Sequence, residues 1–545
     1  MSYFDLLRAP DHVVAVTDDR RIALSDHAGN WADGDVAVTT DLRDDGLAVG
    51  IAAGTTLLQR VILRWRCDVP DGLRFLGDHW ERAYGDLEWR CLAAQRVMPW
   101  YFLAFDGELT HGYGVATQPG AFCCWTVDDA GVNLLLDVRS GGVGVDLGGR
   151  KLAAAVVRTR RGQPGDCPQA AATEFCKLLC PSPRLADHPV YGSNNWYYAY
   201  GKSSHEQILE DTKLLVSYAP TGDNRPYMVI DAGWQGNASG VQEGSCCGGP
   251  WDRSNKQFPD MQRLAAEMAA LGVRPGIWLR PLASAGDEED SVLLPVERAT
   301  DDSAKNKTLD PSIPDILDRI EADFARMRTW GYRIIKHDWT TCDILGRWGF
   351  QMGMTMTNPG WRFYDRSKTT AEVIIALFRA IRRGAGDSLI IGCNTVGHLG
   401  AGLFEVQRTG DDTSGHDWER TRRMGVNTLA FRMPQHNTFF AHDADCVGLT
   451  TQVAWELNRQ WLDLLARSGT PLFVSPDPKA VETEQAKALR AAYAAASTAL
   501  PPAQPLDWMD NTCPRRWVLC GEETTFEWYP DAGVNPSAWT SPGQF

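Results

Sequence analysis

Hydrophobic residues in the first third of the chain come in short runs that are separated by Gly, Asp and Pro. Such runs, for example 61–66, 100–105 and 122–127, recur with turns between them as far as residue 158. Short apolar runs at this spacing are typical of the strands of an all-β sandwich. The rhythm changes at residues 181–183, Pro-Ser-Pro, so we predict an N-terminal β-sandwich domain over residues 1–185.

Beyond this boundary, strand-like runs alternate with segments whose apolar residues have helical spacing. Strands are predicted at 190–196, 227–234, 274–279, 332–338, 388–393, 404–408, 436–442 and 471–475. Helical spacing is clearest at 261–271, 316–327, 371–381, 453–464 and in the Ala-rich stretch 479–497. Eight such units within residues 186–499 fit a (β/α)8 TIM barrel better than an open sheet. Two further β-like runs, 516–519 and 524–528, predict a small C-terminal β segment over 500–545. The fold class expected is therefore multidomain, with all-β and α/β parts.

Composition narrows the partners that this chain can have. Its formal net charge of −15 argues against nucleic acid, which requires clustered Lys and Arg. No apolar run reaches the about eighteen residues that a membrane span needs, and residues 1–8 lack the features of a secretory signal. We therefore expect a cytoplasmic protein without a membrane partner, whose 14 cysteines remain thiols. The pairs Cys123-Cys124 and Cys246-Cys247 do not have the spacing of a zinc site.

Polar and aromatic residues gather at the predicted C-terminal ends of the barrel strands, where the catalytic groups of such barrels lie. They include Trp196, Asp231, Trp234, Trp278, Lys336, Asp338, Cys393, Asn394, Arg408 and Asp411. A strand that is apolar along its length has no structural need for a charge at its tip, and burying an unpaired carboxylate is costly. Each of these residues alone could be part of a structural ion pair or of the core. Their joint occurrence on successive strands favours a functional site.

Two of these carboxylates, Asp338 and Asp411, suggest a reaction. A pair of carboxylates on the two sides of a glycosidic bond can cleave it by acid and base catalysis. Asp412, next to Asp411, is a competing candidate. Because adjacent residues on an extended strand point to opposite faces, we expect only one of the two to face a substrate. The 21 Trp residues are compatible with a sugar site, since aromatic rings stack on sugars, but large cores also contain Trp.

Six stretches occur here in an order that resembles the retaining α-galactosidases, the melibiases and their raffinose synthase relatives. They are 230–235, 276–279, Lys336-x-Asp338, 408–411, 442–446 and 471–475. The resemblance covers about residues 190–480 and extends more weakly to the N-terminal β region. It implies that Asp338 is the nucleophile and Asp411 the general acid/base, with Lys336 beside Asp338 favouring its ionised form. In a retaining enzyme, the two carboxyl groups lie roughly 5–5.5 Å apart.

The resemblance also implies the substrate-binding residues. Lys336 and Arg408 would hold the sugar ring. Trp196, Trp234 and Trp278 are our candidates for the pocket wall, with core packing as the alternative for each. Asp231, Cys393 and Asn394, at neighbouring strand ends, complete the predicted set. No cofactor is implied. A metal site at His442, Asp443 and Asp445 is the minor alternative, because hard cations recruit more oxygen ligands than these residues supply.

Two positions depart from the pattern of the resembled enzymes. Where they have two consecutive acids that hold the 4- and 6-hydroxyls of galactose, this chain has Asp231 followed by Ala232. An apolar methyl group cannot replace a charged hydrogen bond, worth about 1.5–3 kcal/mol, so ordinary galactose binding is in question. The second departure is His337, between Lys336 and Asp338. We expect its side chain to point toward the helices or to be a hydrogen-bonded core histidine, with a proton relay as the alternative.

These inferences predict a retaining α-glycosidase that hydrolyses a terminal α-galactoside or a close relative, such as an N-acetylgalactosaminide or an arabinopyranoside. Two alternatives stay open: glycosyl transfer to a sugar acceptor, as in raffinose synthases, and a carbohydrate-binding relative that has lost catalysis. A metal-dependent barrel hydrolase is a third. By analogy with other sandwich-plus-barrel enzymes, a homo-oligomer is a candidate assembly.

Overall fold

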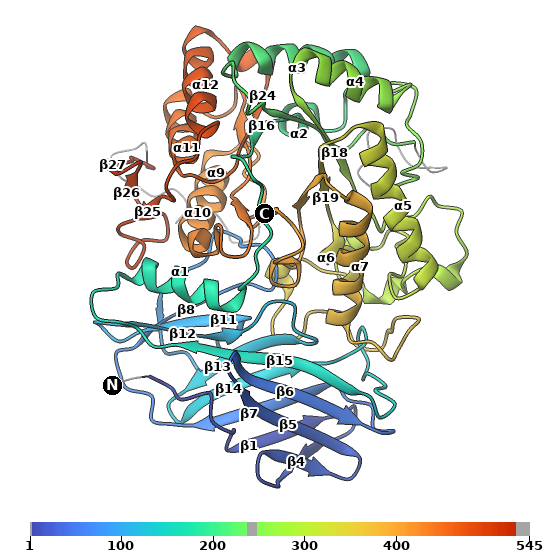
Figure 1. Cartoon of the computed structure of the whole chain (residues 1–545), viewed down its shortest axis with the longest axis vertical. Helices are drawn as coiled ribbons and strands as arrows, with labels where there is room; N and C mark the ends of the chain where they lie inside the picture. Colours follow the sequence, from blue (N-terminus) through green and yellow to red (C-terminus); the bar gives the residue numbers. More distant parts are fainter. Residues whose placement is uncertain (1–2, 237–247, 530–545) are drawn as a thin grey trace.

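The computed structural model describes residues 3–236 and 248–529. The start of the N-terminus, the Cys246-Cys247 pair and the end of the predicted C-terminal segment, from residue 530, lie outside the described residues. Two layers of antiparallel sheet form the lower part of the molecule in Figure 1, and a barrel of strands surrounded by helices forms the upper part. Among the described helices, none combines the length and the apolarity that crossing a bilayer requires.

The N-terminal region folds into two antiparallel sheets. The first has the order β10-β13-β14-β7-β1-β2 and the second the order β3-β4-β5-β6-β15-β12-β11-β8-β9. The first sheet comprises β1 (His12–Val16), β2 (Arg21–Ala23), β7 (Arg60–Arg66), β10 (Met98–Pro99), β13 (Phe122–Asp128) and β14 (Gly131–Asp137). The second comprises β3 (Ser25–Asp26), β4 (Asn30–Asp33), β5 (Val36–Arg43), β6 (Gly46–Ala53), β8 (Arg74–Gly77), β9 (Arg90–Cys91), β11 (Tyr101–Phe105), β12 (Thr110–Val115) and β15 (Lys151–Arg160). The sheets pack face to face through rings such as Trp125 and Phe102, whose centroids are 5.7 Å apart.

The last part of this region is helical, which the sequence pattern had not indicated. Helix α1 (Pro168–Leu179) starts with proline at its first turn and buries Ala172, Phe175 and Leu179 along one face. It lies between the sheets and the barrel (Figure 1). Phe175 packs directly on the backbone of β12 because residue 112 is glycine: a Cβ there would lie 2.2 Å from Cγ of Phe175.

A parallel sheet with the order β22-β21-β20-β19-β18-β17-β16-β24-β23 forms the TIM-like barrel. Its strands are β16 (Tyr191–Asn194), β17 (Tyr227–Ile230), β18 (Arg274–Leu279), β19 (Ile334–His337), β20 (Leu389–Gly392), β21 (Val406–Arg408), β22 (Ala441–Asp443), β23 (Val447–Leu449) and β24 (Leu472–Pro476). The two edges, β22 and β23, are consecutive in the chain and are separated only by residues 444–446, so one interrupted segment closes the barrel. The predicted strand 436–442 was wrong for its first part, because Asn437 has a positive φ of 58° that bends the chain before β22 begins.

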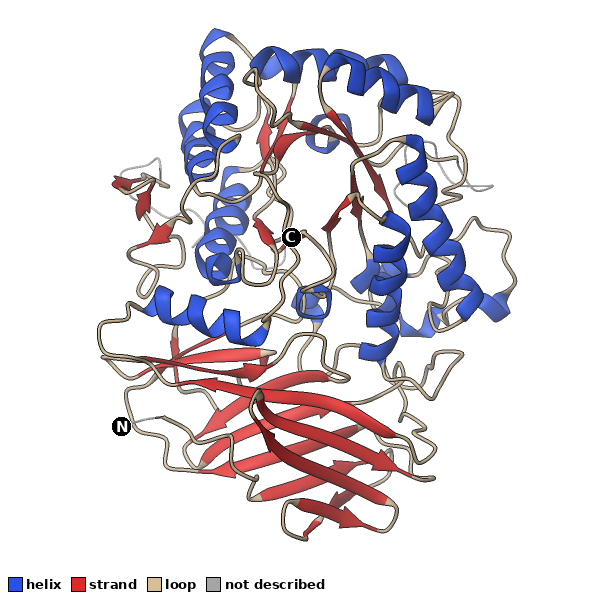
Figure 2. Ribbon diagram, viewed as in Figure 1, coloured by secondary structure: helices blue, strands red, loops and turns tan. Residues whose placement is uncertain are grey.

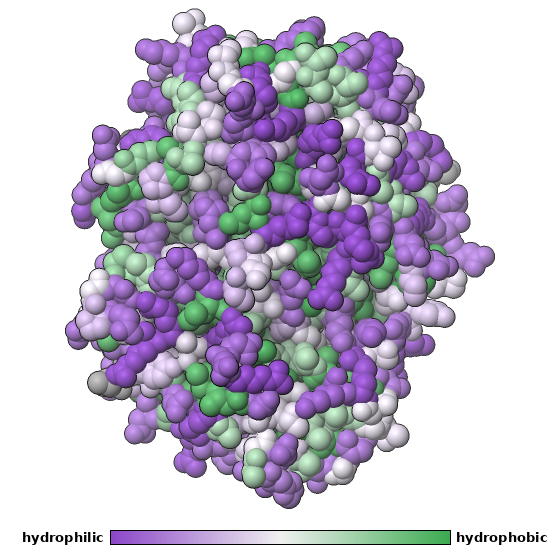
Figure 3. All heavy atoms as spheres, viewed as in Figure 1, coloured by the Kyte–Doolittle hydropathy of each residue, from purple (hydrophilic) through white to green (hydrophobic). Residues whose placement is uncertain are grey.

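Helices cover the outside of the barrel (Figure 2). The α-helices are α2 (Trp196–Ala199), α3 (His205–Tyr218), α4 (Met261–Leu271), α5 (Pro314–Trp330), α6 (Thr340–Leu345), α7 (Thr370–Ala385), α8 (Gly397–Gly400), α9 (Trp418–Thr421), α10 (Asn427–Arg432), α11 (Trp455–Arg467) and α12 (Thr483–Ala496). Short 3-10 helices are η1 (Asp290–Val292), η2 (Val296–Arg298), η3 (Asp302–Ala304), η4 (Gly349–Gln351), η6 (Met433–Gln435) and η7 (Pro478–Ala480), and η5 (Arg422–Val426) is a π-helix. A small antiparallel sheet, with β25 (Gln504–Pro505), β26 (Arg516–Leu519) and β27 (Glu522–Thr525), follows the barrel. The visible face of the molecule is mainly hydrophilic, with scattered apolar groups (Figure 3).

Candidate active site

A polar cavity of about 330 Å³ lies at the C-terminal ends of the barrel strands. Its lining residues are Arg82, Trp196, Asp231, Ala232, Trp278, Asp301, Lys336, Asp338, Trp339, Trp348, Phe350, Asn394, Arg408, Asp411, Asp412 and Arg420. Both predicted catalytic carboxylates are among them, as are Trp196, Asp231, Trp278, Lys336, Asn394 and Arg408. Most of the site residues that were predicted from the ends of the strands therefore lie around one cavity.

Two predicted substrate-binding residues, Trp234 and Cys393, do not line the cavity. Trp234 has no exposed surface; it packs against Trp251 and Trp330, and its Nε1 donates to the carbonyl of Trp278 at 2.8 Å. It supports the cavity wall from behind. Cys393 is buried next to the end of β20, and burial raises the pKa of its thiol well above the usual value. The structure therefore does not place these two residues, both predicted to bind substrate, at the cavity surface.

Asp338 follows β19 and is held by three hydrogen-bond donors. Its Oδ2 accepts from Nε1 of Trp278 at 3.1 Å, and its Oδ1 accepts from the backbone N–H of Trp339 at 2.7 Å and from Nδ2 of Asn394. Trp339 and Asn394 have positive φ angles of 69° and 52°. Non-glycine residues adopt this conformation at an energetic cost, and such residues cluster at functional sites. The backbone is thus bent to present donors to this carboxylate.

Lys336 makes its ion pair with Asp231, not with Asp338 as the sequence had suggested. Nζ of Lys336 lies 2.7 Å from Oδ2 of Asp231, which also accepts from Nδ2 of Asn194 at 2.8 Å. Lys336 is two residues deeper in the barrel than Asp338, so its side chain reaches the end of the neighbouring strand β17. Burial alone would lower the pKa of Lys336, but the charges of Asp231, Cys393 and Asp338 together outweigh burial and raise it. The pair forms a charged corner of the cavity.

Arg408 binds carboxylates at the closure of the barrel. Its Nη1 lies 3.0 Å from Oδ1 of Asp445, and its Nη2 contacts Asp412. Asp445 also accepts from the backbone N–H of Thr413 at 2.8 Å and from the hydroxyl of Tyr197. These partners give Asp445 an ionic and hydrogen-bonding role at the closure of the barrel. Burial, followed by the charge of Asp445, raises the pKa of neighbouring Asp443 to about 6.

Asp411 is held by two arginines. Its Oδ1 lies 3.1 Å from Nη2 of Arg82, and its Oδ2 lies 2.6 Å from Nη2 of Arg420. The prediction that only one of Asp411 and Asp412 faces the cavity was wrong, because both residues follow β21 in a loop, where strand alternation does not apply. Burial would raise the pKa of Asp412, but Arg408 and Arg82 outweigh burial and hold it below the usual range.

Arg82 comes from the N-terminal region and was not predicted. It lies in the loop between β8 and β9, and it connects the two candidate catalytic groups: its Nη1 donates to Oδ1 of Asn394, which in turn binds Asp338. Its guanidinium lies over the ring of Trp348, 4.6 Å from the centroid. Arg420, Trp339, Trp348, Phe350 and Asp301 also line the cavity without a signal in the strand pattern, since all of them lie in loops or short helices.

Backbone contacts fix this loop against the segment that carries Asp411. The N–H of Ala83 donates to the carbonyl of Thr409 at 2.7 Å, and the N–H of Asp411 donates to the carbonyl of Ala83 at 2.9 Å. Glu81 anchors the other side, where its Oε1 accepts from the N–H of Gly349 at 2.7 Å. Burial raises the pKa of Glu81. The N-terminal region therefore forms part of the wall of the barrel site.

His337 points away from the cavity toward the helices, as the sequence suggested. Its ring packs against Phe324 of α5, Phe378 of α7 and Phe404, at centroid distances of 6.1, 5.9 and 4.9 Å. Neither ring nitrogen has a hydrogen-bond partner within the part of the chain that the structure describes, so it is not a hydrogen-bonded core histidine. Burial lowers its pKa to about 3, which keeps it neutral at physiological pH.

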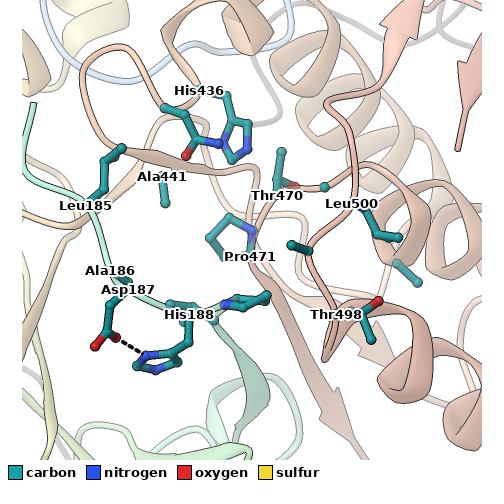
Figure 4. A pocket seen from close by; sticks show the side chains of 17 residues that line it. Leu185, Ala186, Asp187, His188, His436, Ala441, Thr470, Pro471, Thr498 and Leu500 are labelled. Atoms are coloured by element: carbon teal, nitrogen blue, oxygen red, sulfur yellow. Dashed lines mark hydrogen bonds and ion pairs between the residues drawn. The ribbon is translucent and has the colours of Figure 1, made fainter. Parts of the chain in front are cut away.

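A second hollow of about 320 Å³ lies at the opposite end of the barrel strands (Figure 4). It is formed by the chain before β16, β22 and β24 and by the end of α12. Asp187 is the carboxylate in its lining, and it pairs with the adjacent His188. Without a second carboxylate among its lining residues, this hollow lacks the pair of carboxylates that lines the first cavity.

No family model matches the sequence. The fold is similar to solved α-galactosidase structures. An α-galactosidase from Thermus thermophilus in complex with p-nitrophenyl α-D-galactopyranoside has 16% sequence identity and a TM-score of 0.60, over 94% of this chain and 99% of that chain. A glycoside hydrolase family 36 α-galactosidase from Geobacillus stearothermophilus in complex with raffinose has 13% identity and a TM-score of 0.60, over 94% and 79%. The resemblance read from the sequence motifs is thus confirmed for the fold.

Proposed function

We propose that this protein is a retaining α-glycosidase that acts on a terminal α-galactoside or a closely related sugar. The observation that carries the proposal is the meeting of Asp338 and Asp411 in one cavity, where Asn394 and Arg82 connect them. Most glycosidases cleave the glycosidic bond with a pair of carboxylates in such a cavity. The similarity in fold to α-galactosidases, and their complexes with galactosides, support the choice of sugar.

In the first step, an oxygen of Asp338 attacks the anomeric carbon while Asp411 donates its proton to the glycosidic oxygen. The bond to the leaving group breaks as the ester bond to Asp338 forms. In the second step, Asp411 takes a proton from water, whose oxygen attacks the anomeric carbon and releases Asp338. The three donors around Asp338 orient it for attack.

The corner formed by Asp231 and Lys336 is the proposed binding place for the sugar hydroxyls. Both side chains present charged groups to the cavity, and Trp278 lies beside them. Ala232 lines the same corner with a methyl group. The proposal therefore extends to relatives of galactose, such as an N-acetylgalactosaminide or an arabinopyranoside, which change the substituents of the ring.

Variants of the two carboxylates test the mechanism. Asp338→Ala should lower hydrolysis of an α-galactoside by at least about 10³-fold, since covalent catalysis is lost. Added azide should then yield the β-galactosyl azide, because azide attacks from the side that Asp338 vacated. Asp411→Ala with azide should yield the α-galactosyl azide through the intact intermediate. Asp412→Ala is the matched control. Added azide should not restore its activity, and no α-galactosyl azide should form. Full activity of Asp338→Ala would contradict the proposal.

A further inference from the structure

The cavity has two unlike ends. At one end, Asp231 and Trp278 are buried, with Trp278 only 1% exposed, and the side chain of Lys336 is 12% exposed. At the other end, the side chain of Phe350 is open to solvent, with 55% of its surface exposed. Asp338 links the two ends through its contacts: it accepts hydrogen bonds from Trp278 and from Asn394, and Asn394 binds Arg82, which lies over Trp348.

The position of Asp411 shows which end receives the leaving group. The general acid must lie beside the glycosidic oxygen, so the leaving group extends from Asp411 away from the buried corner. Arg82 connects Asp411 to the open end, since one edge of its guanidinium binds Asp411 while its face covers the ring of Trp348. Phe350, two residues after Trp348, lines the cavity at this end.

Phe350 has a fixed position although it is exposed. Its ring meets that of Tyr84 edge to face, at 5.1 Å between centroids and 74° between planes. The residue before it, Gly349, donates its N–H to Glu81 at 2.7 Å and to the hydroxyl of Tyr84 at 3.0 Å. An exposed aromatic ring that is held at the rim of a polar cavity offers a preorganised stacking surface. A ligand that stacks on it loses little free energy in ordering the side chain.

From this geometry we infer that Phe350 forms the leaving-group subsite and that this subsite takes an aglycone containing a ring, which stacks on the Phe350 side chain. The shared chemistry of such aglycones is a flat apolar face, which either a second sugar or an aryl group provides. The inference rests on the proposed function, because it depends on the assignment of Asp411. It assigns the specificity for the leaving group to a contact between the N-terminal region and the barrel.

Three substrates with the same galactosyl group test the inference. 4-Nitrophenyl α-galactoside carries an aryl ring, melibiose carries a sugar ring, and α-galactosyl fluoride carries none. For Phe350→Ala, the ratio of kcat/KM on a ring-bearing substrate to kcat/KM on the fluoride should fall about tenfold, which equals about 1.4 kcal/mol. Phe350→Tyr should keep the ratio within about twofold, since it retains the ring. Tyr364→Ala is the matched control: Tyr364 is 68% exposed, lies outside the cavity lining and should leave the ratio unchanged.

The outcomes distinguish a subsite for sugar rings from one for aryl rings, and they distinguish failure of the Phe350 subsite from failure of the proposed function. A fall for both ring-bearing substrates supports a subsite for sugar and aryl rings alike, and a fall for one of them assigns the subsite to that ring. A ratio for Phe350→Ala within twofold of the unaltered protein overturns the inference while leaving the proposed function in place. Failure of the unaltered protein to release fluoride overturns the proposed function, and the inference with it.

Discussion

At the scale of single residues, His337 gives the clearest consequence for stability. It is fully buried among phenylalanine rings, and its pKa falls to about 3 because burial disfavours the charged form. The unfolded chain takes up a proton at this residue near pH 6.5, so below that pH the unfolded state binds more protons than the folded state. The contribution of His337 to stability is therefore lost as the pH falls from about 6.5 toward 3.

We expect His337→Phe to stabilise the protein, by about 1–3 kcal/mol at pH 8, because it removes buried polar atoms that have no partner. At pH 5 the gain should be about 2 kcal/mol larger, since the unfolded variant no longer takes up the proton. Urea denaturation at the two pH values measures both gains. His27→Phe, at an exposed histidine, should show no such difference. Equal gains for His337→Phe at pH 5 and pH 8 would show that its titration does not affect stability.

How far single site residues could be predicted depended on what positions them. Asp338, Lys336 and Arg408 were predictable because each ends a strand whose apolar pattern places it at the rim of the barrel. Arg82 was not, because its role follows from the packing of a distant loop onto the barrel, and no periodic pattern in the sequence records that contact. The partner of Lys336 was missed for a related reason: the reach of the side chain, not its distance in sequence from Asp338, decides which carboxylate it meets.

At the scale of elements, the turn after β19 is held by a buried ion pair. Arg280, directly after β18, donates from Nε to Oδ2 of Asp343 on α6 at 2.9 Å, and both side chains are almost fully buried. The guanidinium also covers Trp339, 4.2 Å from its ring centroid. Because the N–H of Trp339 binds Asp338, this pair helps to orient the proposed nucleophile.

We expect Asp343→Ala to destabilise the protein by about 1.5–3 kcal/mol, because the buried guanidinium of Arg280 loses the charged hydrogen bonds that it makes to this carboxylate. kcat should also fall, since Trp339 loses its support. The double variant Arg280→Met/Asp343→Leu should recover much of the stability, because no buried charge remains, but it should not recover kcat. Denaturation curves and steady-state kinetics measure the two effects. A double variant as unstable as Asp343→Ala would show that the loss does not come from the charge of Arg280.

Elements with one strong pattern were predicted well, and irregular ones were not. The apolar run of β18 and the amphipathic stripe of α7 agree with the sequence interpretation at nearly every residue. The seventh barrel strand was predicted to begin too early, because Phe439 and Phe440 before β22 are apolar and buried although they belong to a turn region. Helix α1 was missed since the region before it is all β, and the π-helix η5 has no sequence pattern of its own.

At the scale of the whole molecule, the N-terminal region and the barrel share one buried interface. Trp100 of the former stacks on His398 of the latter at 4.9 Å. Oδ1 of Asp78, at the start of the loop that carries Arg82, lies 2.6 Å from Nη2 of Arg432. Nη1 of Arg432 donates to the carbonyl of Thr409 at 3.1 Å, two residues before Asp411. The sequence indicated the change of architecture near residue 185. It did not indicate this interface, because the contacting residues come together only when both parts are folded.

Asp78→Ala should therefore affect stability and activity together. The buried guanidinium of Arg432 loses its carboxylate, which should lower the free energy of unfolding by about 3–5 kcal/mol. Because Arg432 also holds Thr409, the segment with Asp411 should shift, and kcat/KM should fall by about ten- to a hundredfold under conditions where the variant is folded. Arg150→Ala removes a part-buried ion pair with Glu372 in the same interface, but neither residue lines the cavity, so this variant should leave kcat/KM unchanged. If Asp78→Ala lost stability but kept its kcat/KM, the contact of Asp78 with Arg432 would contribute to stability only. The position of Asp411 would then depend on the barrel alone.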